Sequence, residues 1–156
     1  MIYQSHRWGY SEILFASAEV CLARAVGVAG GASSLHTHRD KANLFHVLHG
    51  FVEIHGEQGK IVTLDKHRHP VFVAPPRMVH RMVFQTDAIL FEVYTPGLNR
   101  TVQLEDIQRL DHGRYPEHLD RDALGRLARD DGLLAQWIDK TREHLACHSV
   151  TAALGT

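Results

Sequence analysis

The sequence predicts an all-β domain, an antiparallel barrel or sandwich, followed by two helices. From about residue 13 to about residue 94, short runs rich in valine, isoleucine, phenylalanine and leucine are separated by glycine and proline. Short strands at such close spacing are typical of antiparallel barrels and sandwiches. After Pro116 the apolar residues recur at helical spacing instead. We therefore expect one barrel domain over residues 1–115 and a helical C-terminal extension over residues 116–156.

The expected elements follow in order along the chain. The strand segments are residues 20–26, 44–48, 51–55, 60–64, 71–74, 80–84 and 89–94. Gly50 separates the second segment from the third and marks a tight turn. The expected helices cover residues 120–130 and 133–146, with Asp131 and Gly132 between them. Because an apolar helical stripe needs burial, we expect these helices to pack on the barrel or on a dimer partner.

Composition narrows the class of partner. Seventeen lysines and arginines against eighteen aspartates and glutamates give a formal net charge of −1, so no strong field directs the protein to nucleic acid or to a membrane surface. We expect no nucleic-acid or membrane partner, a small-molecule ligand, and a cytoplasmic location, since no stretch reaches the ~18 apolar residues of a membrane span. Cys21 and Cys147 lack any motif spacing, and we expect two buried thiols without a disulfide.

Three histidines, His36, His38 and His80, are the candidate metal ligands. Residues two apart on a strand face the same side, so His36 and His38 can present their imidazoles to one ion. His80 begins a later apolar strand and would supply the third ligand. Neutral imidazole suits a divalent metal ion, with zinc, iron, nickel, manganese and copper all open, and three imidazoles leave positions for water, substrate or oxygen. A second such pair, His67 and His69, is expected in a surface loop.

The order of these residues resembles the two sequence motifs of the cupin superfamily. The matching pattern is Gly30-x5-His36-x-His38-x4-Asn43-x6-Gly50, followed by Pro75-x4-His80. This resemblance implies a small cupin, a double-stranded β-helix or jelly-roll barrel, with the metal inside. Cupins usually carry glutamate at the position of Asn43, and in the second motif Arg77 and Phe84 replace a glycine and an asparagine.

A closer resemblance, over residues 7 to about 114, is to the cupin-type mannose-6-phosphate isomerase domain. It is carried by residues 7–12 (RWGYSE), 34–38 (SLHTH), 91–93 (FEV) and 105–109 (EDIQR). In that family the metal ligands occupy the positions of His36, His38, Asn43 and His80. The family also has arginines at the positions of Arg24, Arg109 and Arg114, which implies substrate binding because guanidinium pairs well with phosphate or carboxylate. For Asn43 we expect a weak metal ligand or a hydrogen-bond donor to bound substrate.

Strand parity predicts the rest of the pocket. Residues that alternate with Asn43 or His80 along their strands should line it, and these are Phe45, Val47, Met82 and Phe84. Glu53 alternates with apolar neighbours and should face outward, so the sequence assigns no catalytic residue. Asn43 offers at most a neutral amide oxygen in place of a proton-accepting carboxylate.

Three functions therefore stay open. The first is a metal-binding cupin of sugar-phosphate isomerase-like ancestry that binds a small anionic or carbohydrate-like ligand. The second is an Fe(II)-dependent cupin dioxygenase that uses three histidines. The third is a non-catalytic ligand-binding cupin. In each case we expect a homodimer, because the apolar edges and the helical tail need cover.

Overall fold

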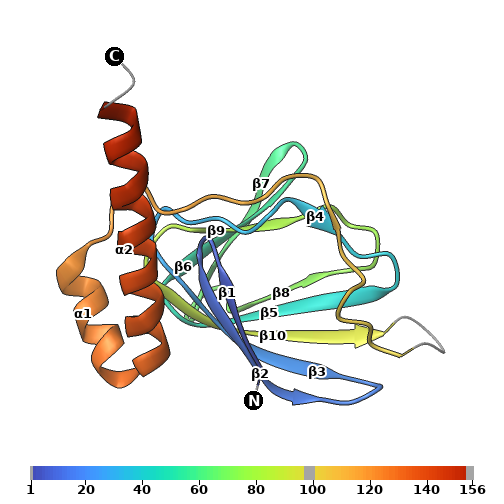
Figure 1. Ribbon diagram of the computed structural model, residues 1–156. Coiled ribbons are helices and arrows are strands. Elements are labelled where there is room, and N and C mark those ends of the chain that lie inside the picture. The colour runs from blue at the N-terminus through green and yellow to red at the C-terminus, as the bar shows by residue number, and fades with distance from the viewer. Residues whose placement is uncertain (1, 97–100, 154–156) are drawn as a thin grey trace. The chain divides into compact units, whose positions relative to one another are not determined.

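The computed structural model describes the backbone of residues 2–96 and 101–153, and the side chains of this part as far as residue 147. The chain divides into two compact units, Met1–His118 and Leu119–Thr156. The first unit contains all the strands and the second contains both helices (Figure 1). The predicted order, a β domain followed by two helices, is confirmed.

The larger sheet of the first unit has six antiparallel strands. Their order across the sheet is β1 (Ile2–His6), β2 (Gly9–Ala16), β3 (Cys21–Gly27), β10 (Ala88–Pro96), β5 (Lys41–His49) and β8 (Val71–Ala74). Because β10 lies between β3 and β5, the chain leaves this sheet after β5 and later returns to its centre. β10 is the last strand of this sheet along the chain, and its side chains lie next to those of β3 and β5.

The second layer is built from shorter strands. A three-stranded sheet has the order β7 (Gly59–Asp65), β6 (Phe51–Gly56) and β9 (Arg81–Phe84), and a two-stranded ribbon pairs β11 (Gln108–Arg109) with β4 (His36–Thr37). An antiparallel bridge between His36 and His80 joins the ribbon to the residue that precedes β9. Figure 1 shows these strands facing the six-stranded sheet across the interior of the barrel.

All the predicted strand segments form strands, and four further strands were not predicted. β1 was missed because its residues, IYQSH, are largely exposed and show no apolar alternation. β2 begins ahead of the predicted β region, and β4 and β11 have only two residues each. Gly50 makes the expected turn between β5 and β6 with φ of 80°, where a Cβ atom would lie 2.2 Å from the carbonyl oxygen of Asp87.

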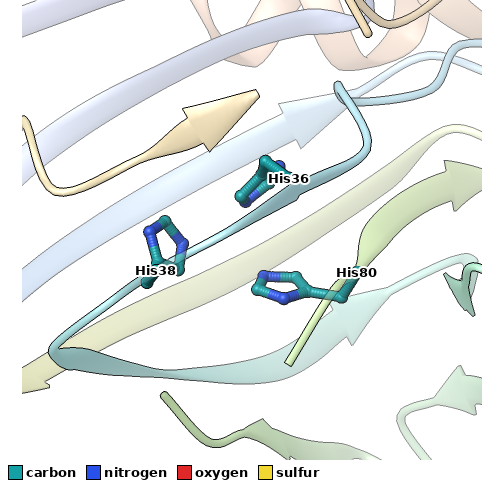
Figure 2. Close-up of side chains that lie close together, drawn as sticks. All are labelled: His36, His38 and His80. Atoms are coloured by element: carbon teal, nitrogen blue, oxygen red, sulfur yellow. The ribbon is translucent and has the colours of Figure 1, made fainter. Parts of the chain in front are cut away.

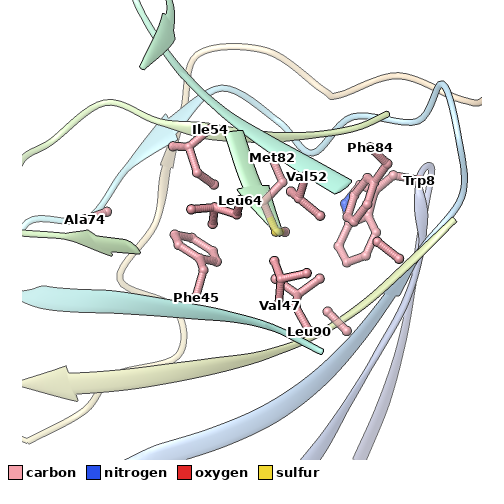
Figure 3. Close-up of a cluster of buried hydrophobic side chains, with 12 residues drawn as sticks. Trp8, Phe45, Val47, Val52, Ile54, Leu64, Ala74, Met82, Phe84 and Leu90 are labelled. Carbon is pink, nitrogen blue, oxygen red and sulfur yellow. The ribbon is translucent and has the colours of Figure 1, made fainter. Parts of the chain in front are cut away.

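The core lies between the two layers, where apolar side chains from both sheets meet (Figure 3). Val52 and Ile54 of β6 are fully buried, as is Leu90 of β10. Glu53, between the two β6 residues, instead contacts His55 and Lys60, as its parity predicted. The side chains of Trp8 and Phe84 stack with 5.1 Å between ring centroids and fill one end of this core.

The second unit consists of α1 (Arg121–Asp130) and α2 (Gly132–Ala153). The first helix matches its predicted bounds to within one residue, whereas the second continues seven residues beyond its predicted end at residue 146. The carboxylate of Asp120 caps α1 by accepting hydrogen bonds from the amides of Asp122 and Ala123. No helix in the described part of the chain is both long enough and apolar enough to cross a bilayer. Neither cysteine forms a disulfide, and Cys21 is buried as expected. The expectation of burial is wrong for Cys147, which lies exposed on α2.

Candidate metal centre

The structure brings His36, His38 and His80 together inside the barrel. One nitrogen of each imidazole lies within 4.8 Å of the corresponding nitrogens of the other two rings. The ring centroids are 4.6 Å apart for His36 and His80, 4.9 Å for His36 and His38, and 5.4 Å for His38 and His80. Figure 2 shows the three rings turned toward one another. Among the described residues, no other group of histidine, cysteine or carboxylate side chains has such a geometry.

Main-chain hydrogen bonds fix two of the three histidines against each other. The amide of His36 donates to the carbonyl oxygen of His80 at 3.0 Å, and the amide of His80 donates to that of His36 at 2.8 Å. Residues paired in this way across an antiparallel ladder have their Cα atoms about 5.5 Å apart and their side chains on the same face. The register of β4 against the start of β9 therefore sets the separation of the two rings.

Hydrogen bonds also fix which nitrogen of each ring faces the centre. The Nδ1 atoms of His36, His38 and His80 lie 2.7, 2.5 and 3.0 Å from carbonyl oxygens of residues 34, 106 and 78, respectively. A carbonyl oxygen only accepts, so each Nδ1 carries the hydrogen and each Nε2 keeps a lone pair. The Nε2 atoms of His38 and His80 are buried and have no hydrogen-bond partner. Metal-binding histidines are usually oriented in this way, and the three residues fit a metal ion.

The surroundings keep these rings neutral. Burial lowers the pKa of His36 to about 3, with a further contribution from the nearby His80. Burial also lowers the pKa of His38 to about 4, and that of His80 below its usual value. A proton therefore does not compete with a metal ion for these nitrogens at neutral pH.

Asp106 holds the turn that follows His38. Its carboxylate accepts hydrogen bonds from the backbone amides of Arg39, Asp40 and Lys41 at 3.0, 2.9 and 3.1 Å. Its own carbonyl oxygen accepts the Nδ1 hydrogen of His38. One residue therefore positions both the histidine ring and the backbone beside it. The sequence indicated Asp106 only as part of residues 105–109, which resemble the mannose-6-phosphate isomerase domain. Its role beside His38 was not predicted, because two residues so far apart in the chain share no local sequence pattern.

A cavity of about 650 Å³ opens beside the histidines, and His36 and His38 line it. The first hairpin contributes residues 4–8 to its wall, and the segment after β10 contributes residues 104, 105, 107, 109 and 112. The cationic groups in the wall are Arg7, Lys41 and Arg109. Burial, with a contribution from Arg109, lowers the pKa of His6 to about 4, so this wall residue is neutral. The cavity wall thus carries two guanidinium groups and the amino group of Lys41, whose pKa is lowered by burial and raised by nearby carboxylates.

Glu92 is a buried carboxylate in the same cavity wall, and sequence reasoning did not assign it to the site. The hydroxyl of Tyr94 donates a short hydrogen bond to its Oε2, and the amide of Asn43 lies 3.5 Å from the same oxygen. Burial raises the pKa of Glu92, while the bonds from Tyr94 and Asn43 act in the opposite direction. The alternation of buried Ala88, Leu90 and Glu92 along β10 was the available signal.

Of the predicted substrate-binding residues, Arg109 lines the cavity and the other two arginines do not. Arg24 lies beside cavity-lining Ala23 on β3, so its side chain is on the opposite face, where it contacts Glu12 at 2.7 Å. The Nε of Arg114 donates to the carbonyl oxygen of Gly30 at 3.1 Å. Asn43 is buried, and its Oδ1 atom has no hydrogen-bond partner.

The four expected pocket residues divide between core and cavity. Met82 belongs to the core and also lines the cavity. Phe45, Val47 and Phe84 share its inward parity but lie in the apolar core and are not part of the cavity wall. The ring of Phe45 nevertheless contacts that of His80 edge-on, with 5.7 Å between the ring centroids. Parity selects the face of a strand, whereas position along the strand decides between pocket and core.

Comparisons with known proteins agree on the architecture. No protein-family model and no curated protein matches the chain. Among solved structures, KdgF from Halomonas sp. is 19% identical with a TM-score of 0.54, over 62% of this chain and 88% of that one. A Klebsiella pneumoniae protein with a double-stranded β-helix domain is 18% identical with a TM-score of 0.52, over 62% and 75% of the two chains. An RmlC-like cupin from Shewanella frigidimarina is 22% identical with a TM-score of 0.50, over 58% and 78%. The chain has the cupin fold.

The turn before His80 contains an unusual backbone angle. Arg77, at the position of the second motif's glycine, has φ of 69°, and among the described residues no other non-glycine residue has a positive φ. Its amide donates to the carbonyl oxygen of His38 at 2.6 Å, so the turn before His80 is tied to the first motif. A residue with a Cβ atom therefore adopts a left-handed conformation at the position where the cupin motif has glycine. The closer likeness to a mannose-6-phosphate isomerase domain stays a prediction, because the structural matches concern the fold.

Proposed function

We propose that this protein is a metal-binding cupin that holds one divalent ion through His36, His38 and His80 and takes a small anionic, carbohydrate-like ligand beside it. The observation that carries the proposal is the set of three converging imidazoles, each with Nδ1 against a carbonyl oxygen. Two buried Nε2 atoms without partners would cost free energy in a site that never meets a cation.

The cavity wall supports the ligand class. Arg7, Lys41 and Arg109 supply positive charge, and Arg109 lies on β11, which pairs directly with the strand of His36. Guanidinium groups form paired, charge-assisted hydrogen bonds with phosphate and carboxylate groups. When bound, the ion would act as a Lewis acid toward an oxygen of the ligand. The chain's own residues would orient the ligand and exclude water around it.

Metal content measured on purified protein tests the proposal. The chain offers a matched control, because His67 and His69 form a second His-x-His pair in which both residues are exposed. We expect about one equivalent of metal in the wild type and in the His67→Ala/His69→Ala variant, and a loss in the His36→Ala/His38→Ala variant. Equal metal content in all three proteins would contradict the assignment.

A second candidate function is an Fe(II)-dependent dioxygenase. It is favoured by the neutral character of the site, in which Asn43 stands where cupins usually have glutamate. Three neutral imidazoles are compatible with ferrous iron and leave positions open. Oxygen consumption by the iron-loaded protein, measured with an electrode in the presence of small phenolic and sugar acids, tests it. The absence of ligand-dependent oxygen uptake would count against this function.

A non-catalytic binding protein is the remaining alternative. A rise in melting temperature with ligand, without turnover of any compound, would favour it.

A further inference from the structure

We propose that the outer face of the six-stranded sheet, over β3, β10, β5 and β8, is the surface on which a second copy of this chain packs. These four strands are neighbours in the sheet, with β8 at its edge (Figure 1). We call this surface the apolar face, and its outward side chains are Leu22, Ile89, Phe91, Val93, Leu44, His46, Leu48, Val71 and Val73. The inference goes beyond the proposed function, because it uses no residue of the cavity or of the candidate metal centre.

Strand parity and register join these side chains into one continuous surface. The buried residues of β5 and β10 point into the barrel, so the residues that alternate with them point outward. One row of paired residues crosses all four strands, and its successive members are Leu22, Val93, Leu44 and Val73. The row beside it consists of Phe91, His46 and Val71. Partners in such a row are close enough for their side chains to touch, so the face has no gap between strands.

The composition of the apolar face is unusual for a surface in contact with water. An antiparallel sheet with one solvated side normally alternates apolar residues inward with polar residues outward. The three-stranded sheet follows this rule, since Glu53 on its outer side forms ion pairs with His55 and Lys60. Over the described lengths of β10, β5 and β8, by contrast, no outward side chain is lysine, arginine, aspartate or glutamate. A contiguous apolar surface of this kind marks a site of protein association.

The edge of the sheet favours packing on the face over extension of the sheet. The edge strand β8 has only four residues, and Pro70 and Pro75 flank it directly. A short edge strand between prolines offers few backbone groups to a further strand. The side chains of this strand are nevertheless open to a partner, because Val71 and Val73 are 46% and 49% exposed. A partner therefore gains more by covering the side chains than by pairing with the backbone.

Size and charge both favour a second copy as the occupant. With up to nine residues in each strand, a rise of about 3.4 Å per residue and a strand spacing of about 4.8 Å, the four strands present roughly 500 Å² in each chain. Two copies would then bury roughly 1,000 Å² together, about the least that a specific interface needs. A two-fold axis puts the same surface on both sides of an interface, and two faces without fixed charges can meet without burying an unpaired one. A partner with a charged surface would find no ion pair there.

Sedimentation velocity of the full chain, over about 1 to 100 μM protein, tests the proposal. The substitution is Val73→Glu, in the row that crosses all four strands, and the control is Ile61→Glu on β7. Both residues are β-branched and lie on edge strands, and their exposed fractions are similar, 49% and 46%. We expect the wild type and Ile61→Glu to form dimers. The dissociation constant of Val73→Glu should rise by about 100-fold or more, because a two-fold dimer would bury two unpaired carboxylates.

Several outcomes would overturn the proposal. They are a wild type that stays monomeric over this range, Val73→Glu with the dissociation constant of the wild type, and an equal loss of association in both variants. If circular dichroism shows that Val73→Glu does not fold, Val73→Thr replaces it, since threonine is also β-branched and suits a strand. We then expect association to weaken by about tenfold, and an unchanged dissociation constant overturns the proposal. Metal content should be equal in all these proteins, so a failure of metal binding would contradict the proposed function alone.

Discussion

His36 and His80 face each other across an antiparallel bridge and exchange both main-chain hydrogen bonds, at 3.0 and 2.8 Å. The two cupin-like motifs therefore meet at their histidines. The backbone pairing sets the geometry of the candidate metal centre, and the side-chain conformations then refine it. Ligand rings held by a ladder of this kind lose little freedom when a metal binds. The predictions below test the residues that surround this bridge.

Replacing Asp106 should weaken metal binding without removing a ligand. In Asp106→Ala the amides of Arg39, Asp40 and Lys41 lose their acceptor, so the backbone whose carbonyl oxygen orients His38 is free to shift. We expect metal affinity to fall by about 10- to 100-fold, as is usual when a group that orients a ligand is removed. Competition with a chromophoric chelator measures the affinity. Asp139→Asn, on an exposed part of α2, is the control; a change of equal size in both variants would point to a general loss of stability.

Replacing Arg77 with glycine should stabilise the protein. The left-handed backbone at φ of 69° costs a residue with a Cβ atom about 1 kcal/mol, whereas glycine adopts it readily. We expect Arg77→Gly to raise the free energy of unfolding by about 0.5 to 1 kcal/mol, measured by urea denaturation. Arg68→Gly, in an exposed turn without a positive φ, should instead be neutral or destabilising. A decrease in Arg77→Gly would show that its side chain contributes more than its backbone costs.

Stability of the metal-free protein should fall as the solution becomes acidic. The pKa values of His36 and His38, about 3 and about 4, lie below the ~6.5 of an unfolded histidine. The unfolded chain therefore takes up protons between about pH 6.5 and pH 4 that the folded chain does not, and the free energy of unfolding decreases through this window. Each group that stays neutral contributes a slope of about 1.4 kcal/mol per pH unit.

Urea denaturation in the presence of a chelator, at pH 7.5, 6 and 5, measures this slope. The His36→Gln/His38→Gln variant should show a shallower dependence, since two of the titrating groups are gone. An identical slope in the variant and the wild type would mean that other groups account for the acid sensitivity. His6, whose pKa is lowered to about 4, contributes to the part of the slope that remains.

Gly27 should not tolerate a side chain, because β3 passes directly beside the ring of Phe84. A Cβ atom on Gly27 would lie 2.0 Å from that ring, which already stacks on Trp8. We expect Gly27→Ala to lower the free energy of unfolding by about 1 to 3 kcal/mol, the usual cost of an overfilled core. Gly125→Ala is the matched control, since nothing lies near that position in α1 and alanine favours a helix. Thermal denaturation of both variants compares them, and an unaffected Gly27→Ala would show that the Phe84 ring moves aside.

The sequence by itself determined the elements whose signal is local. Apolar runs between glycines indicated seven of the strands, helical spacing indicated α1 and α2, and two-residue parity put His36 and His38 on one side of the chain. It also indicated that His80 begins a strand after a turn. In each case the pattern lies within a few neighbouring residues, where the backbone geometry repeats.

Tertiary structure alone decided which side chains share the cavity. Glu92 reaches the site because β10 inserts between β3 and β5, and Asp106 reaches it because the segment after β10 crosses back over the turn at Asp40. The same long-range pairing brings Arg109 beside His36 and leaves Arg24 on the other face of its sheet. Strand order and register join residues that are far apart in the chain, and no periodic pattern in a single sequence encodes those pairings. The three candidate metal ligands were therefore predictable from their spacing, whereas the carboxylate next to them was not.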